Sequence, residues 1–420
     1  MRGSTAGISD NFIGSNRNHY ILLSVLDTLL SALAVSPAVV GYWRGTWMIM
    51  DHYVFPQQQV YSSWVSVAIG YLGHLLFTLV QAPMTRCFHP DQHRLLYYTA
   101  SRVYTAIFAF VCVNSWRGAW KLIEHHTGHD IGSLVGITVT SVIVLAATRT
   151  LRNISAPPFS IATDDCESYF QVPTMFRVSG SRETSLYVLD CLFSVLIVGT
   201  LVVFVWRGAW TILDLYLYPD QPACSAWTSI VLGYVIVLLA FSLQSTLKGL
   251  CGRLMGLRRL CVVDMYLLFS FCGTINVWRG IWSLLNLYFL PDKPEASYWI
   301  THAGCLLILM LINCSNSILV RGVYIDAEEE GGKCVVFPCY YLRLFFQKKR
   351  KEKLQRLHIQ QLQQQNATNF ATAGNRKSDN ENKEVSGFAT PDVQQSNNTA
   401  NNHAKIPLAA IPLQILQDVP

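Results

Sequence analysis

The pentapeptide Trp-Arg-Gly-x-Trp occurs four times in this chain, and each copy lies at the end of a long apolar run. A repeat at regular spacing constrains the fold strongly, because each copy is expected to form a similar structural unit. The first Trp residues of successive copies are 73, 90 and 72 positions apart, so the chain divides into two halves of two units each. The copies are Trp43-Arg44-Gly45-Thr46-Trp47, Trp116-Arg117-Gly118-Ala119-Trp120, Trp206-Arg207-Gly208-Ala209-Trp210 and Trp278-Arg279-Gly280-Ile281-Trp282.

The similarity between the units extends beyond the pentapeptide. Eight residues after the first Trp, three units have an acid and the fourth has an amide: Asp51, Glu124, Asp214 and Asn286. Val25-Leu26-Asp27 precedes Trp43 at the same offset as Val188-Leu189-Asp190 precedes Trp206. Fourteen residues before the other two copies lie Arg102 and Asp264. The two halves therefore match unit by unit.

The composition indicates a membrane protein. Hydrophobic residues make up 51% of the chain and charged residues only 14%, against about 25% charged residues in a soluble domain. A helix needs about 20 mostly apolar residues to cross a bilayer, and a large soluble protein with buried helices is disfavoured because so many runs of this length have few charges. The eight runs are Tyr20–Trp43, Val60–Ala82, Leu95–Trp116, Ile131–Thr148, Leu186–Trp206, Cys224–Thr246, Cys261–Trp278 and Tyr298–Val320.

We predict an all-α membrane protein with eight transmembrane helices, built from four two-helix repeats in two pseudo-symmetric halves. Lys and Arg cluster in the loops after the even-numbered runs and after the last run, whereas the loops after odd-numbered runs carry only Lys121 and Lys293 besides the motif arginines. Positive loops face the cytoplasm, so both termini are predicted to be cytoplasmic and the four motifs to lie at the opposite face. The predicted segments are a cytoplasmic N-terminus (1–19), spans one to four (20–148), a cytoplasmic linker (149–185), spans five to eight (186–320), a juxtamembrane basic segment (321–357) and a disordered tail (358–420).

The residue types of the motif suggest how it works. Trp favours the membrane–water interface, Arg reaches headgroups or stacks on an indole, and Gly allows another helix to approach closely. Arg44 and Asp51 are seven residues apart, about 10 Å along a helix, so an arginine pairs more easily with the acid of another unit. We therefore expect a ring of four motifs around a pseudo-symmetry axis. The motifs then serve as interfacial anchors and packing elements, as the entrance for a solute or ion, or as a docking surface.

Four charges, Asp27, Arg102, Asp190 and Asp264, lie inside the apolar runs towards the predicted cytoplasmic side. Ionisable groups within a membrane are costly and usually face the interior of the bundle. We expect Arg102 to pair with one of these aspartates. The group forms either a polar contact between helices, or carboxylates wetted by the cytoplasm, or part of a transport or gating pathway.

Other functional signals are weak. Glu124, His125, His126, His129 and Asp130 could bind a divalent cation, but their spacing matches no specific zinc motif, and a solvated loop is the simpler interpretation. The sequence has no phosphate-binding loop, dinucleotide fingerprint, nucleophile elbow or zinc-protease motif. We therefore predict no enzymatic activity and no cofactor. The net charge of +6 is explained by the cytoplasmic loops and tail, so it does not predict nucleic-acid binding.

The four Trp-Arg-Gly-x-Trp copies in a chain with eight apolar runs resemble the fuseless family of invertebrate membrane proteins, over about residues 20–325. The resemblance implies a protein of the presynaptic plasma membrane that supports the organisation of voltage-gated calcium channels and evoked transmitter release. It implies no catalytic residue, and it carries over only the motif residues. Asn286 departs from the pattern of the other three units, which have an acid at this position. If that acid is functional, the fourth unit is not expected to have the same function.

Two other function classes fit the residues. Internal repeats and charges within the membrane are also found in secondary transporters and channels, and such a protein should have a central cavity. An assembly or trafficking factor is the third class. Membrane lipids are the only partner that the residues themselves indicate, and the sequence gives no indication of an oligomeric state.

Overall fold

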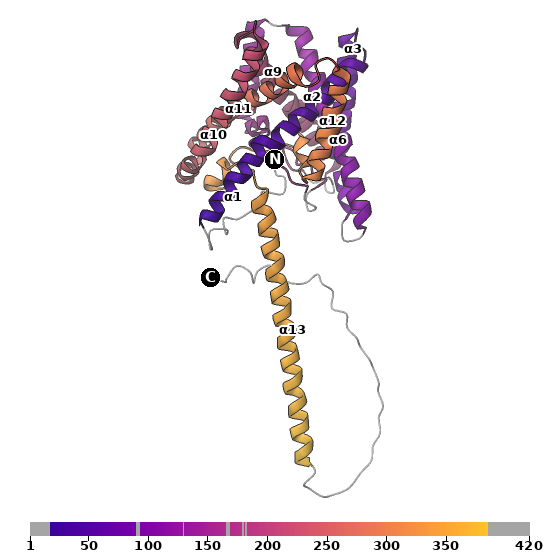
Figure 1. The fold of residues 1–420 in the computed structure, drawn as a ribbon, viewed down its shortest axis with the longest axis vertical. Coiled ribbons are helices and arrows are strands. Elements are labelled where there is room, and N and C mark those ends of the chain that lie inside the picture. The colour runs from indigo at the N-terminus through magenta and orange to yellow at the C-terminus, as the bar shows by residue number, and fades with distance from the viewer. Residues whose placement is uncertain are drawn as a thin grey trace. The chain divides into compact units, whose positions relative to one another are not determined.

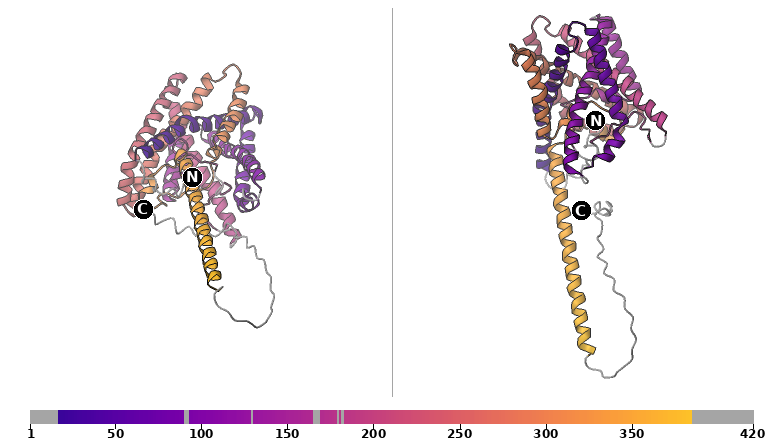
Figure 2. Two further views of the ribbon diagram at one scale, coloured as in Figure 1. Left: turned by 60° about the horizontal axis from the view of Figure 1, so that its bottom comes forward. Right: turned by 90° about the vertical axis from the view of Figure 1, so that its right-hand side faces the viewer.

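The computed structural model describes residues 17–89, 93–128, 130–164, 169–178, 180 and 183–384. Within these ranges the chain is helical and contains no strand. The structure divides into two units, residues 1–351 and 352–420. Figure 1 shows the ribbon, and Figure 2 shows from two further directions that the helices of the first unit form one bundle.

Helices occupy all eight apolar runs. The first half contains α1 (Arg17–Leu30) continuing into α2 (Ser36–Tyr53), α3 (Gln59–Val67) continuing into α4 (Gly73–Leu79), then α5 (Gln81–Cys87), α6 (Arg94–Thr127) and α7 (Ile131–Ala147). The second half contains α8 (Thr184–Leu192) continuing into α9 (Gly199–Tyr216), then α10 (Pro222–Arg253), α11 (Gly256–Tyr288) and α12 (Pro294–Leu311). Single π-helical segments join the paired pieces, at Ser31–Val35, Ala68–Leu72 and Phe193–Val198.

Six of these helical segments are long and apolar enough to cross a membrane. They span Asn18–Tyr53, Gln59–Leu79, Arg94–Thr127, Thr184–Tyr216, Pro222–Arg253 and Gly256–Tyr288. Helix α7 is a shorter apolar helix of 17 residues, and α12 has 18. Proline occupies the first turn of α10 and α12, where its missing N–H would have no partner in the helix.

In each unit, the helix that follows the motif-bearing helix packs on the motif-bearing helix of the next unit. Helix α3 packs on α6, α7 on α9, α10 on α11, and α12 returns to pack on α2. These four contacts close the helices into a ring, because α12 contacts α2 of the first helical segment.

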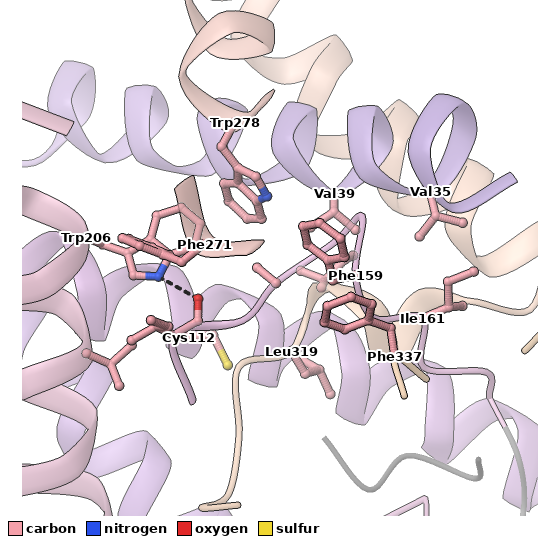
Figure 3. Close-up of a cluster of buried hydrophobic side chains, with 14 of the residues drawn as sticks. Val35, Val39, Cys112, Phe159, Ile161, Trp206, Phe271, Trp278, Leu319 and Phe337 are labelled. Carbon is pink, nitrogen blue, oxygen red and sulfur yellow. Dashed lines mark hydrogen bonds between the residues drawn. The ribbon is translucent and has the colours of Figure 1, made fainter. Parts of the chain in front are cut away.

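The segments that follow α7 and α12 fold into the bundle rather than merely connecting helices. The first forms a 3₁₀ turn, η4 (Leu151–Ile154), and the second forms η7 (Ser315–Ile318) and η8 (Gly331–Val335). Leu151, Phe159 and Ile318 are fully buried. Figure 3 shows Phe159 and Phe337 from these two segments side by side beneath the Val35–Val39 face of the first long helix. Residues 150–162 of the predicted linker are thus mostly buried, as are Val323, Cys334 and Phe337 of the predicted basic segment, whereas residues 348–357 of that segment are exposed.

The first part of the predicted disordered tail is helical in the structure. Helix α13 runs from Leu342 to Glu384, so residues 358–384 are helical, and residues 385–420 lie outside the described residues. The composition explains the difference, because Gln, Lys, Arg and Leu, which are abundant from 347 to 365, are all good helix formers.

Candidate functional site

The first Trp residues of the four motifs form a closed ring of indoles. Each indole contacts its two neighbours edge to face, a favourable geometry for aromatic pairs. The ring-centroid distances are 5.2 Å for Trp43–Trp116, 5.4 Å for Trp116–Trp206, 5.2 Å for Trp206–Trp278 and 5.7 Å for Trp278–Trp43. Trp43 and Trp206 are 2% exposed and Trp278 is 5% exposed, so this inner ring fills the axis of the bundle.

The second Trp residues repeat the arrangement one helical turn further along. The centroid distances are 5.8 Å for Trp47–Trp120, 6.0 Å for Trp120–Trp210, 5.7 Å for Trp210–Trp282 and 5.9 Å for Trp282–Trp47. These four side chains are only partly buried. Two stacked rings follow directly from the four-residue spacing of the two Trp positions, which lie on one face of each helix.

Three inner indoles are also anchored by hydrogen bonds to the folded linkers. The Nε1–H of Trp43 donates to Ile318 O at 3.1 Å, that of Trp206 to Ile154 O at 3.0 Å and that of Trp278 to Pro157 O at 2.7 Å. Figure 3 shows Trp206 and Trp278 above the linker. The linkers therefore close one end of the inner ring.

The motif arginines pair with the preceding unit, as the spacing predicted. Arg117 donates to Asp51 at 2.7 and 2.9 Å, and Arg279 donates to Asp214 at 2.7 Å. Arg44 completes the circle by donating to Asn286 Oδ1 at 2.7 Å. The fourth unit thus uses a neutral amide where the first and third use a carboxylate.

Serines supply the other acceptors, and the sequence interpretation did not identify them. Arg117 donates to the hydroxyls of Ser62 and Ser66 at 2.6 and 2.5 Å. Arg279 donates to Ser225 and Ser229, both at 2.7 Å, and Arg44 donates to Ser297 at 3.1 Å. The signal was available, because Ser62, Ser225 and Ser297 all lie nineteen residues after the first Trp of their unit.

Arg207 is the exception among the four arginines. Among the described residues no serine of α7 accepts from it, and Val135 and Val139, which lie at the serines' offsets from the first Trp, are exposed. Arg207 donates to Gly128 O at 2.8 Å, and Glu124 is close enough to stabilise its charge. Its Nε has no hydrogen-bond partner among the described residues. All four arginines therefore contact the preceding unit, but Arg207 donates to a backbone carbonyl where the other three donate to side chains.

The motif glycine sets the distance between neighbouring helices. A Cβ on Gly118 would lie 2.6 Å from the backbone nitrogen of Val67, and a Cβ on Gly45 would lie 2.6 Å from that of His302. Gly280 meets Ile230 in the same way, with its backbone nitrogen at 2.9 Å, and Gly208 faces Thr138. The Trp, Arg and Gly positions of the motif thus all contact the neighbouring unit.

The charges within the apolar runs do not face one another across the bundle. Asp27 is fully buried and accepts from Arg343 Nε at 2.7 Å and from Leu342 N at 2.6 Å. Asp190 accepts from the backbone of Phe176 and Val178 at 3.0 and 3.2 Å. Both aspartates therefore bind the ends of the folded linkers.

The predicted pairing of Arg102 with one of the other three charges is wrong. Arg102 forms its salt bridge with Asp164, which lies in the first linker. At the corresponding place in the second half, Asp264 faces another acid, Asp326, with Arg149 nearby. The prediction failed because Asp164 lies in a segment that was interpreted as a connection between the halves.

Asp164 and Asp326 each bind the other half's linker. Asp164 accepts from Asn316 N at 2.8 Å, at the start of the segment after α12. Asp326 accepts from Leu151 N and Arg152 N at 2.8 and 2.7 Å, after α7. Burial raises the pKa of Asp326 to about 6, although these backbone donors oppose the shift.

The described members of the histidine group are not arranged to hold a metal ion. Within the described ranges no three His, Cys, Asp or Glu side chains are placed to hold one ion. His125 and His126 are exposed and contact each other edge to face, and His129 lies outside the described residues.

The arrangement as a whole joins four helical units and fills the axis between them. The two indole rings, the cross-unit arginines and the linker contacts all connect elements that are distant in sequence.

Comparison with known families identifies a family model that matches most of the chain. The family model described as Fuseless matches residues 22–319, which confirms the resemblance based on the four motifs. No curated protein and no solved structure matches the chain.

Proposed function

This chain belongs to the Fuseless family, and from that premise we propose that it supports the organisation of voltage-gated calcium channels, and thereby transmitter release, as a multi-pass protein of the presynaptic membrane. Its role in this proposal is that of a non-enzymatic organiser, with membrane lipids and a calcium-channel complex as partners and without nucleic acid. The family resemblance supplies the biological setting, and the packing of the bundle supports the physical role.

The filled axis is the observation that favours an organiser over a conduit. A transporter or channel with an axial pathway needs space between its four units. Here the inner indoles lie 5.2–5.7 Å from their neighbours and three of them are at most 5% exposed. A closely packed protein core is rigid. Such a core suits a platform on which another membrane protein is positioned.

We further propose eight membrane crossings in four two-helix units. Six helical segments meet the length and hydropathy expected of a span. Helices α7 and α12 are about 26–27 Å long at 1.5 Å per residue, close to the 30 Å core of a bilayer. Support comes from their packing, because α7 contacts α9 and α12 contacts α2 in the way that α3 contacts α6.

In this proposal both termini are cytoplasmic and the motifs face outwards. The distribution of Lys and Arg supports this orientation. Asn153, which lies in an acceptor sequence for glycosylation, is also consistent with it. Its side chain donates to Thr150 O and Tyr324 O and accepts from Tyr324 N, so an attached glycan would disrupt the linker.

The test is a rescue experiment in neurons that lack the protein. We expect the wild-type chain to restore presynaptic calcium current and evoked release. A chain ending at Lys351 retains the first unit, which has its own internal contacts, and separates the contribution of the second unit. The proposal is rejected if the calcium current in the null neurons equals that in rescued neurons.

A flux assay addresses the alternative. Purified wild-type protein in vesicles should conduct no more ion current than Trp206→Ala, which opens the inner ring. A selective current through the wild-type protein that Trp206→Ala alters would instead assign a transport function.

A further inference from the structure

A cavity lies beside the inner ring, between residues of both halves. It has a volume of about 80 Å³ and is lined by residues of α4, α6, the Phe193–Gly199 region, α9 and both folded linkers. A single water needs about 10–15 Å³ of such space. The cavity can therefore hold a group of several heavy atoms.

The second half has aromatic side chains at the corresponding place. Phe159 stacks on Phe241 at 5.3 Å and contacts Phe337 at 4.4 Å, and Phe337 packs on Tyr266 at 5.1 Å. Figure 3 shows Phe159 and Phe337 in contact. The space that remains in this region is only about 20 Å³.

The correspondence between the two places follows from the repeat. Phe241 lies 163 residues after Thr78 and Phe337 lies 163 residues after Thr174, the offset that relates Trp43 to Trp206. Phe159 corresponds to Arg321. Each lies two residues before a linker N–H that bonds a proline carbonyl, Ile161 N to Pro338 O at 3.2 Å and Val323 N to Pro173 O at 2.7 Å. Three phenylalanines in one half are thus replaced by two threonines and an arginine in the other.

The replacement makes the cavity cationic. Arg321 and Arg152 both line it, and no described carboxylate forms a salt bridge with Arg321. Arg321 donates to the Tyr104 hydroxyl at 3.1 Å and lies 5.8 Å from the centre of that ring. Asp326 partly balances Arg152. A guanidinium is always charged, so a half-buried Arg321 without a carboxylate favours an anion in this space.

The remaining lining residues select the type of anion. Ser115, Ser155 and Thr174, which carry hydroxyl groups, line the same space. Guanidinium and hydroxyl donors together match the oxygens of a phosphate group. Val198 and Val202 form an apolar wall, which suits the part of an ester next to the phosphate.

We propose that this cavity binds a phosphate group, carried by a phospholipid headgroup or by a soluble phosphate ester. The site is built from residues of both halves, since Thr78 and Arg321 are 243 positions apart in sequence. A bound phosphate would therefore link the first half's helices to the segment after α12.

Binding is measured on the full-length protein purified in a non-ionic detergent. The probes are dioctanoyl phosphatidic acid, glycerol 3-phosphate and inorganic phosphate, with native mass spectrometry and thermal shift as readouts. We expect at least a tenfold weaker binding for Arg321→Gln, which keeps a polar side chain, and for Thr174→Phe, which introduces the residue of the second half. Binding of phosphatidic acid alone identifies a lipid as the source of the phosphate, whereas binding of the two soluble probes identifies a soluble ester.

Two controls keep the result interpretable. Arg253→Gln changes an exposed arginine away from the cavity and should bind like wild type. Phe337→Thr enlarges the corresponding place in the second half without adding a guanidinium, so it should gain no binding. Should Thr174→Phe fail to fold, Arg321→Gln decides the question. The proposal is overturned if wild type binds none of the probes, or if folded Arg321→Gln binds them as tightly as wild type.

Discussion

Replacing Arg117 by Gln tests whether the cross-unit arginine contacts hold the bundle together. The Arg117 side chain is 1% exposed and donates to Asp51, Ser62 and Ser66. A Gln side chain is shorter and neutral, so it cannot reach the carboxylate and both serines from α6. The substitution therefore leaves Asp51 without its buried partner.

The expected loss follows from the burial of the pair. Breaking a buried ion pair from one side costs about 3–5 kcal/mol. The Asp51 side chain is 27% exposed and also pairs with Lys121 at 2.8 Å, so its charge keeps water and one cation. We therefore expect the lower end of the range, about 3 kcal/mol, for Arg117→Gln.

Asp51→Asn should be milder, at about 1 kcal/mol, because it removes a charge but leaves an acceptor. Asn286 already plays this role for Arg44 at 2.7 Å. The double mutant closes a thermodynamic cycle, in which residues in direct contact should couple by about 1–2 kcal/mol.

The assay is unfolding of the full-length protein in detergent, by titration with SDS and followed by circular dichroism. Arg253→Gln at an exposed site serves as the control and should stay within about 0.5 kcal/mol of wild type. A loss below about 1 kcal/mol for Arg117→Gln, or a cycle without coupling, would refute the reasoning and make the arginine an interfacial anchor only.

Three further predictions concern the motif glycine Gly118, the inner ring and the Asp326 carboxylate that accepts from Leu151 N and Arg152 N. Gly118→Ala should lower the free energy of unfolding by about 1–3 kcal/mol, because the added Cβ meets the backbone of Val67. Gly136 faces open space, so Gly136→Ala should raise the free energy of unfolding by about 0.5–1 kcal/mol. Equal effects of the two substitutions in SDS unfolding would contradict this. Trp206→Phe should lower the free energy of unfolding by about 2–3 kcal/mol, because it removes the hydrogen bond to Ile154 O and part of the side-chain volume. Trp227→Phe, at an exposed position, should change it by less than about 0.5 kcal/mol. Equal melting temperatures of the two variants would count against a stabilising indole ring. The pKa of Asp326 is raised to about 6, so the folded state binds an extra proton between the unfolded pKa and pH 6, and stability should rise by about 1 kcal/mol from pH 7 to 5. Asp326→Asn should remove that part of the pH dependence in thermal melts, and an unchanged profile would exclude this group.

The sequence predicted the ring of motifs because each residue of the pentapeptide has a role that depends on spacing. Trp43 and Trp47 lie on one helix face, and the seven-position offset from Arg44 to Asp51 makes a pair with another unit easier than a pair within one unit. The cross-unit contacts follow from these distances. The Arg44–Asn286 bond also shows that a departure from the pattern can preserve geometry while changing charge.

The partners of the four charges within the apolar runs could not be predicted in the same way. Asp164 binds Arg102 from a segment without helical periodicity, and periodicity was the only guide to placement. Sequence patterns show which face of a helix is polar, but not which irregular segment covers that face. The serines are different, because Ser62 and Ser66 recur as Ser225 and Ser229, and a longer comparison of the units would have found them.

The closure of the ring between the last and first units has a consequence for biosynthesis. Arg44 donates to Asn286 and Ser297, which follow it by 242 and 253 residues. At 5–20 residues per second, a ribosome needs roughly 12–50 s to make the chain between Arg44 and Asn286. Throughout that interval the nascent first helix carries a cation whose partners do not yet exist, so lipid phosphates or the insertion machinery must hold it at the interface. Burial of Arg44 is then a late step, and a chain that stops before α12 would display an unsatisfied arginine to the quality-control apparatus of the membrane in which it is made.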